Sequence, residues 1–212
     1  AARGAGGLSV SHGGAGLERA RTVGELLRAA RAALDAQDAR IDSELLLAHV
    51  LERARSYLFA HPEVVVTAPQ CAAYRALIAR RRDGVPLAYL VGHQEFWSLE
   101  LTLDGSTLVP RPETELLVEL ALERLAAAPA RVLDLGTGSG AIALALASER
   151  PQWQVLGIDR DPRALALAVA NAARLRLPNA RFAPGDWFAG LAGERFDLVV
   201  SNPPYIRDDD PC

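Results

Sequence analysis

The sequence of 212 residues contains no lysine and no methionine, and only two of its residues are cysteines. All 23 basic residues are therefore arginines. Cys71 and Cys212 are far apart and do not follow the short spacing of a zinc site, so neither a metal centre nor a disulfide scaffold is expected. So low a cysteine content is typical of a reducing compartment, and we expect a cytoplasmic protein.

Long apolar runs and a strong charge imbalance are also absent. No stretch of about 18 consecutive apolar residues suggests a membrane-spanning helix. The formal net charge of −3 argues against a protein that coats nucleic-acid backbone, so no direct nucleic-acid partner is expected. Residues 1–20 are rich in Gly, Ala and Ser and lack an apolar signal segment, and we expect a flexible tail there.

Residues 21–92 are predicted to form a small helical domain. Thr22 followed by Glu25 resembles a capping box at the start of the first helix. Three stretches have apolar residues at helical spacing, namely 23–34, 39–53 and 71–84. The second of these is apolar on nearly every side. Because the apolar faces exceed what three short helices need for one another, we expect this domain to recognise a protein substrate.

The rest of the chain predicts an α/β fold. A β-strand and linker are expected at 93–112, because leucines alternate with polar residues over 99–103 before a turn at Asp104-Gly105. Residues 113–212 open with a helix and then alternate strands with helices. The predicted strands are 131–135, 153–159, 180–186 and 196–202. Such alternation is typical of a parallel, Rossmann-like sheet, in which ligands bind beyond the carboxyl ends of the strands.

The first of these strands ends in a glycine-rich turn, DLGTGSG, over residues 134–140. Its three glycines let a ligand approach backbone N–H groups at the start of a helix. The next strand ends at Asp159, whose carboxylate can accept hydrogen bonds from ribose hydroxyls. The succession of strand, glycine turn, helix and acidic strand end predicts a cofactor that contains an adenine nucleoside. Both NAD and S-adenosylmethionine are such cofactors. Asp134 would repel a pyrophosphate and attract an amino or sulfonium group, which favours S-adenosylmethionine.

A third strand end carries the sequence PGDWF at residues 184–188. Asp186 could accept from the adenine amino group, and Trp187 could stack on the adenine ring. The alternative is a turn aspartate beside a core tryptophan. At the glycine turn, likewise, the alternative is a packing turn with Asp159 capping the next helix.

The last predicted strand runs into SNPPYI at residues 201–206. Asn202 offers an amide oxygen that accepts a hydrogen bond and an NH₂ group that donates one. Pro203 and Pro204 offer carbonyl groups on a stiff backbone, and Tyr205 adds a flat wall. This combination predicts a rigid cage of acceptors for an –NH₂ group, whose nitrogen could then attack a methyl group in line.

DLGTGSG, Asp159 and NPPY together resemble the Rossmann-like S-adenosylmethionine-dependent methyltransferases that modify planar nitrogens. The stretches ARIDSELLLAHVL, RRRDGVPLAYLVGHQEFWSL and LVPRPETE narrow the resemblance, over about residues 22–206, to the release-factor glutamine-N5 methyltransferase family. The resemblance implies S-adenosyl-L-methionine as cofactor, with S-adenosyl-L-homocysteine as product. It implies that the partner and substrate is a peptide chain release factor, methylated on the glutamine of its GGQ motif.

The strand-end motifs and the resemblance assign the site as follows. The expected cofactor-binding residues are Asp134, Gly136, Thr137, Gly138, Ser139, Gly140, Asp159, Asp186, Trp187 and Asn202. The glutamine is expected to be held by Asn202, Pro203, Pro204 and Tyr205. Of these, Asn202 and Pro203 are the expected catalytic residues, and no metal is expected.

Family members continue beyond NPPY with further strands, whereas this sequence stops at Cys212. We therefore expect the methyltransferase sheet to be truncated at its C-terminal side. Three alternatives stay open: a methyltransferase acting on another nitrogen (a ribosomal-protein glutamine or a nucleic-acid adenine), an inactive cofactor-binding fragment, and an NAD-dependent oxidoreductase. The last is disfavoured by Asp134 and by the lack of a proton-transfer residue.

Overall fold

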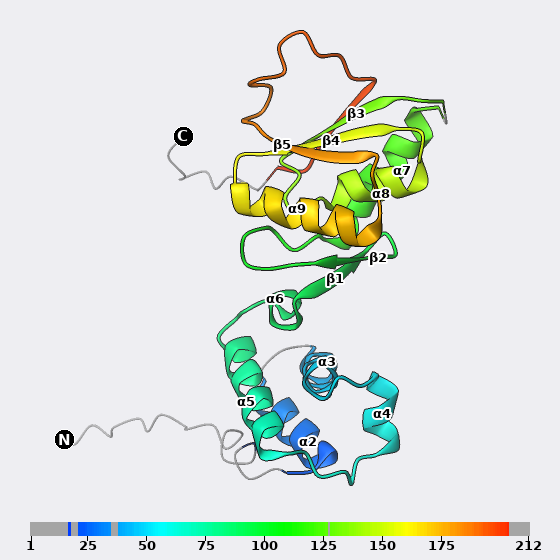
Figure 1. The fold of residues 1–212 in the computed structure, drawn as a ribbon. Coiled ribbons are helices and arrows are strands. Elements are labelled where there is room, and N and C mark those ends of the chain that lie inside the picture. Colours follow the sequence, from blue (N-terminus) through cyan, green and yellow to red (C-terminus); the bar gives the residue numbers. More distant parts are fainter. Residues whose placement is uncertain (1–16, 18–20, 35–37, 127, 204–212) are drawn as a thin grey trace, which may run out of the picture. The chain divides into compact units, whose positions relative to one another are not determined.

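The structure is a computed structural model that describes Leu17 and residues 21–34, 38–126 and 128–203. The chain divides into two compact units, Ala1–Val91 and Gly92–Cys212 (Figure 1). Apart from Leu17, the tail expected at residues 1–20 lies outside the described residues. None of the described helices is both long and apolar enough to cross a bilayer.

The described part of the first unit is helical. Its helices are α2 (Val23–Ala33), α3 (Ala39–Leu51), α4 (Arg55–Ala60), α5 (Ala68–Arg82) and α6 (Leu87–Val91). The three helices predicted from periodicity are thus confirmed as α2, α3 and α5. Helices α4 and α6 were missed, since one or two turns are too short to show a helical period.

Side-chain caps begin two of these helices. At α2 the capping box is confirmed, because the Thr22 hydroxyl accepts from the Glu25 N–H at 3.3 Å and the Glu25 carboxylate accepts from the Thr22 N–H at 3.1 Å. A second box, formed by Thr67 and Gln70, begins α5. Such caps satisfy N–H groups that have no partner within the helix.

Helix α3 departs from its expected apolar character. Three successive polar residues on it are buried, namely Asp42, Ser43 and Glu44. The core around them is apolar and includes Leu26 of α2, Leu46 and Leu47 of α3, and Tyr74 and Ile78 of α5. Polar groups this deep need partners, because a buried unpaired charge is strongly destabilising.

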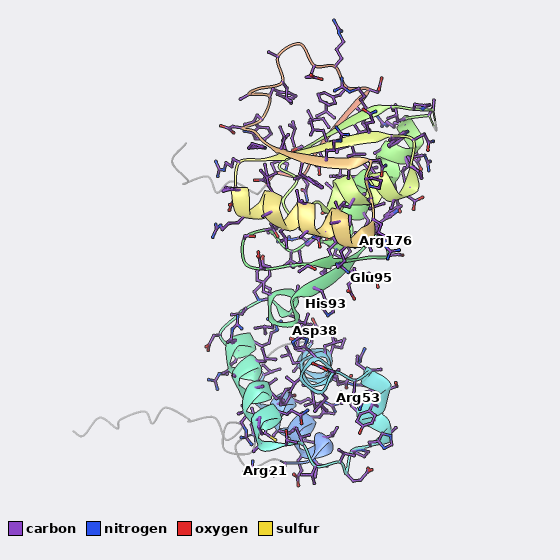
Figure 2. The ribbon with its side chains drawn as sticks, in the orientation of Figure 1. Arg21, Asp38, Arg53, His93, Glu95 and Arg176 are labelled. Carbon is purple, nitrogen blue, oxygen red and sulfur yellow. The ribbon has the colours of Figure 1, made fainter. Side chains whose placement is uncertain are left out.

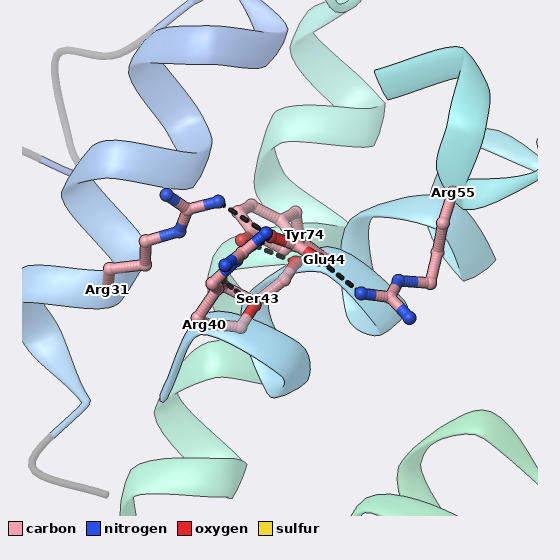
Figure 3. Close-up of polar contacts among 6 residues, drawn as sticks. All are labelled: Arg31, Arg40, Ser43, Glu44, Arg55 and Tyr74. Atoms are coloured by element: carbon pink, nitrogen blue, oxygen red, sulfur yellow. Dashed lines mark hydrogen bonds and ion pairs between the residues drawn. The ribbon is translucent and has the colours of Figure 1, made fainter. Parts of the chain in front are cut away.

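Glu44 finds its partners in three arginines, which converge on its carboxylate in Figure 3. Arg31 of α2 donates at 2.7 Å, Arg40 of α3 at 3.1 Å and Arg55 of α4 at 2.5 Å. Burial alone would raise the pKa of Glu44, but the hydrogen bonds from Arg55 and Arg40 outweigh burial and hold the pKa below its usual value. The cluster therefore joins three helices through one charged group.

The other buried polar residues of α3 join it to α5. The Asp42 carboxylate accepts from Arg81 Nε at 2.6 Å. The Tyr74 hydroxyl donates to the Ser43 carbonyl at 3.0 Å. The Ser43 hydroxyl itself donates to the Arg40 carbonyl at 2.8 Å. The buried side chains of Asp42, Ser43 and Glu44 are therefore all paired, as the energetics of a small core require.

The second unit contains a parallel sheet, as expected. Its strands are β3 (Arg131–Leu135), β4 (Gln154–Asp159), β5 (Ala180–Pro184) and β6 (Leu198–Ser201), in the order β5-β4-β3-β6. The predicted strands are all present, with shorter limits for β4, β5 and β6. In the described sheet β6 pairs with β3, and its residue Val199 is 44% exposed while Val200 is buried.

Helices connect these strands. The short 3₁₀ helix η1 (Pro112–Thr114) leads into α7 (Glu115–Arg124), and α8 (Ala141–Glu149) and α9 (Pro162–Leu175) follow β3 and β4. Helices α8 and α9 lie on one face of the sheet (Figure 1), as right-handed crossovers in the same direction require. Arg176, labelled in Figure 2, is the C-cap of α9. Its backbone is left-handed (φ 57°).

The two faces of the sheet bury different sets of residues. On the helix side, Val132 and Val155 pack with the apolar residues of α8. On the other side, Leu133, Leu135 and Ile158 pack with partly buried side chains that include Leu191 and Phe196. Strands β3 and β4 are therefore covered on both faces, which explains why their sequences read as continuous apolar runs.

A hairpin replaces the single strand expected near residues 99–103. Strand β1 (His93–Phe96) pairs antiparallel with β2 (Leu99–Thr102). Trp97 and Ser98 form the turn, both with positive φ (51° and 57°). Such turns normally contain Asn or Gly, so no turn motif marked this one.

Two carboxylates from outside the hairpin hold the Trp97 turn. Glu115 of α7 accepts from the Trp97 backbone N–H at 2.9 Å, and Glu149 of α8 accepts from its indole N–H at 2.8 Å. A bulky residue with positive φ is strained by about 1–2 kcal/mol and persists where its surroundings over-determine it. The turn is therefore a product of tertiary contacts.

The Glu44 cluster leads to a stability prediction. Glu44→Gln keeps the shape of the side chain and removes the charge that three arginines share. We expect a loss of roughly 2 kcal/mol in the free energy of unfolding, below the roughly 3–5 kcal/mol of a fully buried pair because the arginines are partly exposed. Urea unfolding followed by far-ultraviolet circular dichroism measures the loss.

Glu63→Gln is the matched control, since its side chain is 72% exposed and exposed charges contribute little. Equal unfolding free energies for the two variants would contradict the assignment of Glu44 as the charged centre of this unit.

Candidate functional site

The ends of three strands meet at one edge of the sheet because β3 pairs with a strand on each side. Leu135, the last residue of β3, is paired with Ile158 of β4 and with Ser201 of β6. The Ser201 hydroxyl also donates to the Leu135 carbonyl at 2.9 Å. The residues that follow, Gly136, Asp159 and Asn202, therefore leave the sheet side by side.

The glycine turn adopts a conformation that glycine favours. Gly136, Gly138 and Gly140 have φ angles of 70°, 56° and 85°, in the left-handed region where a side chain is disfavoured. The N–H groups of Gly136 and Thr137 donate to the Ile158 carbonyl at 2.9 and 3.0 Å. The turn is thus anchored to the end of β4.

Asp159 adds a second anchor to this turn. One oxygen of its carboxylate accepts from the Gly138 N–H at 2.9 Å, and the other accepts from the Asp161 N–H at 3.0 Å. The N-cap of α9 is Asp161, which accepts from the Arg163 N–H at 2.8 Å. The suggestion that Asp159 serves as the cap of α9 is therefore wrong; its carboxylate lies at the glycine turn.

The underside of the turn leaves no room for side chains. A Cβ at Gly157 of β4 would lie 2.6 Å from the Phe182 ring, and one at Gly140 would lie 3.1 Å from it. Gly140 was among the residues expected from the sequence. Gly157 was missed, although a glycine inside an apolar strand is a signal of close approach.

Asp134 is buried beneath the turn. One carboxylate oxygen accepts from the Thr137 hydroxyl at 2.6 Å, and the other, Oδ1, makes no hydrogen bond of normal geometry to the described residues, although the Ala143 backbone N–H is near enough to lower the pKa of the carboxyl group. Burial raises the pKa of Asp134 to about 6, although the Thr137 hydroxyl lowers it. A buried carboxylate oxygen without a partner fits a cationic group at this position.

Space above the turn is consistent with a ligand there. A Cβ at Gly136 would meet no heavy atom within 4 Å, while one at Gly138 would meet only Thr107, at 3.9 Å. The turn therefore has free space for a ligand around Gly136 and Gly138, close to the Asp159 carboxylate.

The third strand end is tied to the second, because the Gly185 N–H donates to the Asp159 carbonyl at 3.1 Å. Trp187 is 57% exposed, so the alternative of a core tryptophan is wrong. Its φ of 50° is unusual for a bulky residue, and such outliers suggest a functional constraint. Within the described residues, the exposed Asp186 carboxylate makes no hydrogen bond to the glycine turn.

Asn202 lies just beyond β6 and is half-buried. Its Nδ2 donates to the Thr114 hydroxyl oxygen at 3.0 Å. Pro203 is exposed, and Pro204 and Tyr205 lie outside the described residues. Sequence reasoning missed Thr114, although it stands within the quoted stretch LVPRPETE.

A second polar residue that sequence reasoning missed supports the turn from below. Asn171 of α9 is fully buried. Its Oδ1 accepts from the Thr102 N–H at 2.9 Å, and its Nδ2 donates to the carbonyls of Thr102 (3.1 Å) and Ser139 (3.0 Å). The available signal was an asparagine inside an apolar helix, where such a residue needs internal partners.

Comparison with known proteins first identifies the class of protein to which the second unit belongs. Residues 112–210 match the family model of the methyltransferase small domain, and residues 25–92 match that of the PrmC N-terminal domain. Ribosomal protein L11 methylase from Lactobacillus delbrueckii subsp. bulgaricus is similar with a TM-score of 0.40 and 31% identity, over 44% of this chain and 47% of that one. The match of residues 112–210 to the methyltransferase small domain identifies the second unit as a methyltransferase domain, and its parallel sheet is Rossmann-like.

The particular family follows from curated relatives. The chain is 52% identical over 186 residues to the release factor glutamine methyltransferase of Escherichia coli (strain K12), covering 87% of this chain and 67% of that protein. It is 54% identical to the Pseudomonas aeruginosa protein of the same name, covering 84% and 64%. The chain belongs to the release factor glutamine methyltransferase family. It spans about two thirds of the length of these relatives.

The buried Asp134 leads to a pH-dependent prediction. Its pKa is about 6 in the folded protein against an ordinary value of 3.8, so between these values the folded state binds the proton more tightly. Wild-type stability therefore falls as pH rises through this window. An asparagine does not titrate, so the Asp134→Asn variant lacks this pH dependence. We expect its unfolding free energy, relative to that of wild type, to rise by about 2 kcal/mol from about pH 4 to pH 7.

Denaturant unfolding of both proteins across this range measures the difference, and the same substitution at the exposed Asp83 serves as the control. A wild-type minus variant difference that does not change with pH would show that Asp134 is not titrating in a buried site.

Proposed function

We propose that this protein transfers a methyl group from S-adenosylmethionine to the side-chain amide nitrogen, N5, of the glutamine in the GGQ motif of peptide chain release factors. Membership of the family supports the reaction type. The observation that carries the proposal is the position of Asn202, which follows β6 at the edge shared with the glycine turn.

The cofactor supplies a methyl group attached to a positively charged sulfur. The buried Asp134 carboxylate would attract the cationic tail, and the opening over Gly136 would admit it. Asp159 would accept from the ribose hydroxyls, with Gly138 held against it. The exposed ring of Trp187 would stack on adenine, and Asp186 would accept from the adenine amino group. Thr137, Gly138, Ser139 and Gly140 would line the turn, and Asn202 would close the site on the side of β6.

For the glutamine, the chain would supply acceptors only. Asn202 Oδ1 and the carbonyls of Pro203 and Pro204 would accept from the substrate –NH₂ group, and Tyr205 would form a wall. Acceptors fixed around that nitrogen orient its lone pair and stabilise the positive charge that develops on it. No general base is needed before transfer, because the proton can leave the nitrogen afterwards.

We also propose that the helical unit contacts the release factor. Three large apolar side chains on it are exposed, namely Ile41 (45%), Phe59 (51%) and Val65 (70%). Exposed apolar side chains are common on protein surfaces, so this supports a protein partner only in combination with the family. Since release factors act in translation, we place the activity in the cytoplasm and expect no direct nucleic-acid partner.

Mass spectrometry of a release factor tests the proposal. Purified release factor is incubated with S-adenosylmethionine and the full-length protein, then digested. We expect one added methyl group on the GGQ glutamine. Asn202→Ala is expected to reduce turnover by about 100-fold or more, because removing a hydrogen-bond acceptor that orients the reacting group typically lowers the rate by that factor.

Asn202→Asp is the companion variant, because it keeps an acceptor oxygen but adds a charge and removes the amide donor. We expect both variants to keep most of the wild-type cofactor affinity, because Asn202 only closes the cofactor site and the carboxylates and glycine turn that would hold the cofactor are unchanged. A methyl group on another residue would overturn the substrate, and full turnover by Asn202→Ala would overturn the role of the amide.

A further inference from the structure

We propose that Thr114 is a positioning residue for the methyl transfer: its hydroxyl holds the Asn202 amide so that the amide oxygen faces the incoming –NH₂ group. The inference rests on the proposed function and extends it to a residue 88 positions earlier in the chain. Thr114 would not touch substrate or cofactor; it would act through Asn202.

The contact itself is well placed for this role. The Thr114 hydroxyl oxygen lies 3.0 Å from Asn202 Nδ2. Thr114 is only 9% exposed, so water competes poorly for the bond. Its own backbone is fixed, since the Thr114 N–H donates to the Arg111 carbonyl at 2.9 Å at the junction of η1 and α7.

An asparagine needs such a partner because its two ends have opposite chemistry. A half-turn about the last side-chain bond exchanges the acceptor oxygen for the NH₂ donor. This torsion is broad and nearly two-fold, so the rotamer preference of Asn202 does not choose between the two orientations. A substrate –NH₂ group donates hydrogen bonds, so it must face the Asn202 amide oxygen. In the flipped orientation the Asn202 NH₂ group would face it instead, and two donors would oppose each other.

The hydrogen bond to Thr114 restricts the rotation of the amide. A hydroxyl can accept or donate, and in the structure the Nδ2 end contacts it, which leaves Oδ1 for a substrate –NH₂ group. No residue in the described part of the chain donates a hydrogen bond to Asn202 Oδ1. Losing the Thr114 oxygen would leave the half-buried NH₂ group free to rotate and short of a partner.

The elements that carry the two residues are firmly joined. Val118 of α7 and Val200 of β6 belong to one buried cluster. The Ser201 hydroxyl, bound to the Leu135 carbonyl at 2.9 Å, fixes the backbone just before Asn202. Rigid support of this kind is what a positioning group requires. It also gives a role to the PET segment of LVPRPETE, whose Pro112 begins η1.

The test compares Thr114→Val, which keeps the shape and removes the hydroxyl, with Thr114→Ser, which restores it. In the full-length protein we measure kcat and KM for release factor, cofactor affinity and melting temperature. We expect Thr114→Val to lower kcat about tenfold or more with cofactor affinity unchanged, and Thr114→Ser to recover most of the loss.

Thr67→Val is the matched control. Thr67 forms a capping box in the helical unit, so its loss should lower stability and leave kcat unchanged. If Thr114→Val keeps wild-type kcat while the wild type methylates release factor, the inference is wrong and the proposed function stands. A kcat loss that Thr114→Ser fails to restore would also overturn the inference.

A second measurement tests the hydrogen bond between Thr114 and Asn202 directly, even if the wild type does not methylate release factor. The sequence contains three asparagines, so ¹⁵N-asparagine labelling gives few side-chain amide signals, and Asn202→Asp assigns one pair. We expect Thr114→Val to shift that pair and speed its hydrogen exchange, and Thr114→Ser to reverse both changes. An Asn202 pair that is identical in Thr114→Val and wild type would show that the hydroxyl does not hold the amide.

Discussion

The pairing of β3 with β4 on one side and β6 on the other is the constraint on which the site depends. Backbone hydrogen bonds fix this register, and Leu135 is thereby aligned with both Ile158 and Ser201. A slip of one residue would turn Asp134 to the other face of the sheet and separate the glycine turn from the strand ends beside it. The groups proposed to hold the cofactor and the glutamine therefore come together because of strand register, and the loops only refine their positions.

Side chains remote in sequence provide this refinement. The Asp159 carboxylate holds the Gly138 amide, Asn171 holds the Ser139 carbonyl, and Thr114 holds the amide of Asn202. Each bond replaces a contact with water by an internal one and contributes about 1 kcal/mol of stability, more where a charge is involved. Their larger effect is to restrict the orientation of groups around the site before any ligand arrives. Asp134 has the opposite character, because its buried oxygen costs stability that a cationic ligand would recover.

Sequence patterns were sufficient for the parts of the molecule that follow a single local rule. Alternating strands and helices predicted the parallel sheet, and positive-φ glycines and strand-end aspartates predicted the turn with Asp159. The hairpin turn at Trp97 was missed because glutamates from α7 and α8 stabilise it, and neither is local. Buried Glu44 was missed because an apolar pattern was taken to describe the whole of α3. Thr114 and Asn171 are ordinary polar residues by sequence, and their partners are 88 and 32 to 69 positions away, so three-dimensional placement was needed to find them.

We propose that the ends of β3 and β4 form one cofactor site, in which the Asp159 carboxylate binds the Gly138 N–H of the turn and would also accept from the ribose. Calorimetric titration with S-adenosylmethionine tests it most directly, using wild type, Asp159→Ala and the control Asp161→Ala, which removes the nearby cap of α9. We expect the affinity for S-adenosylmethionine to fall about tenfold or more in Asp159→Ala, since charge-assisted hydrogen bonds are lost, and to change little in Asp161→Ala. Equal cofactor affinity in wild type and Asp159→Ala would contradict the account.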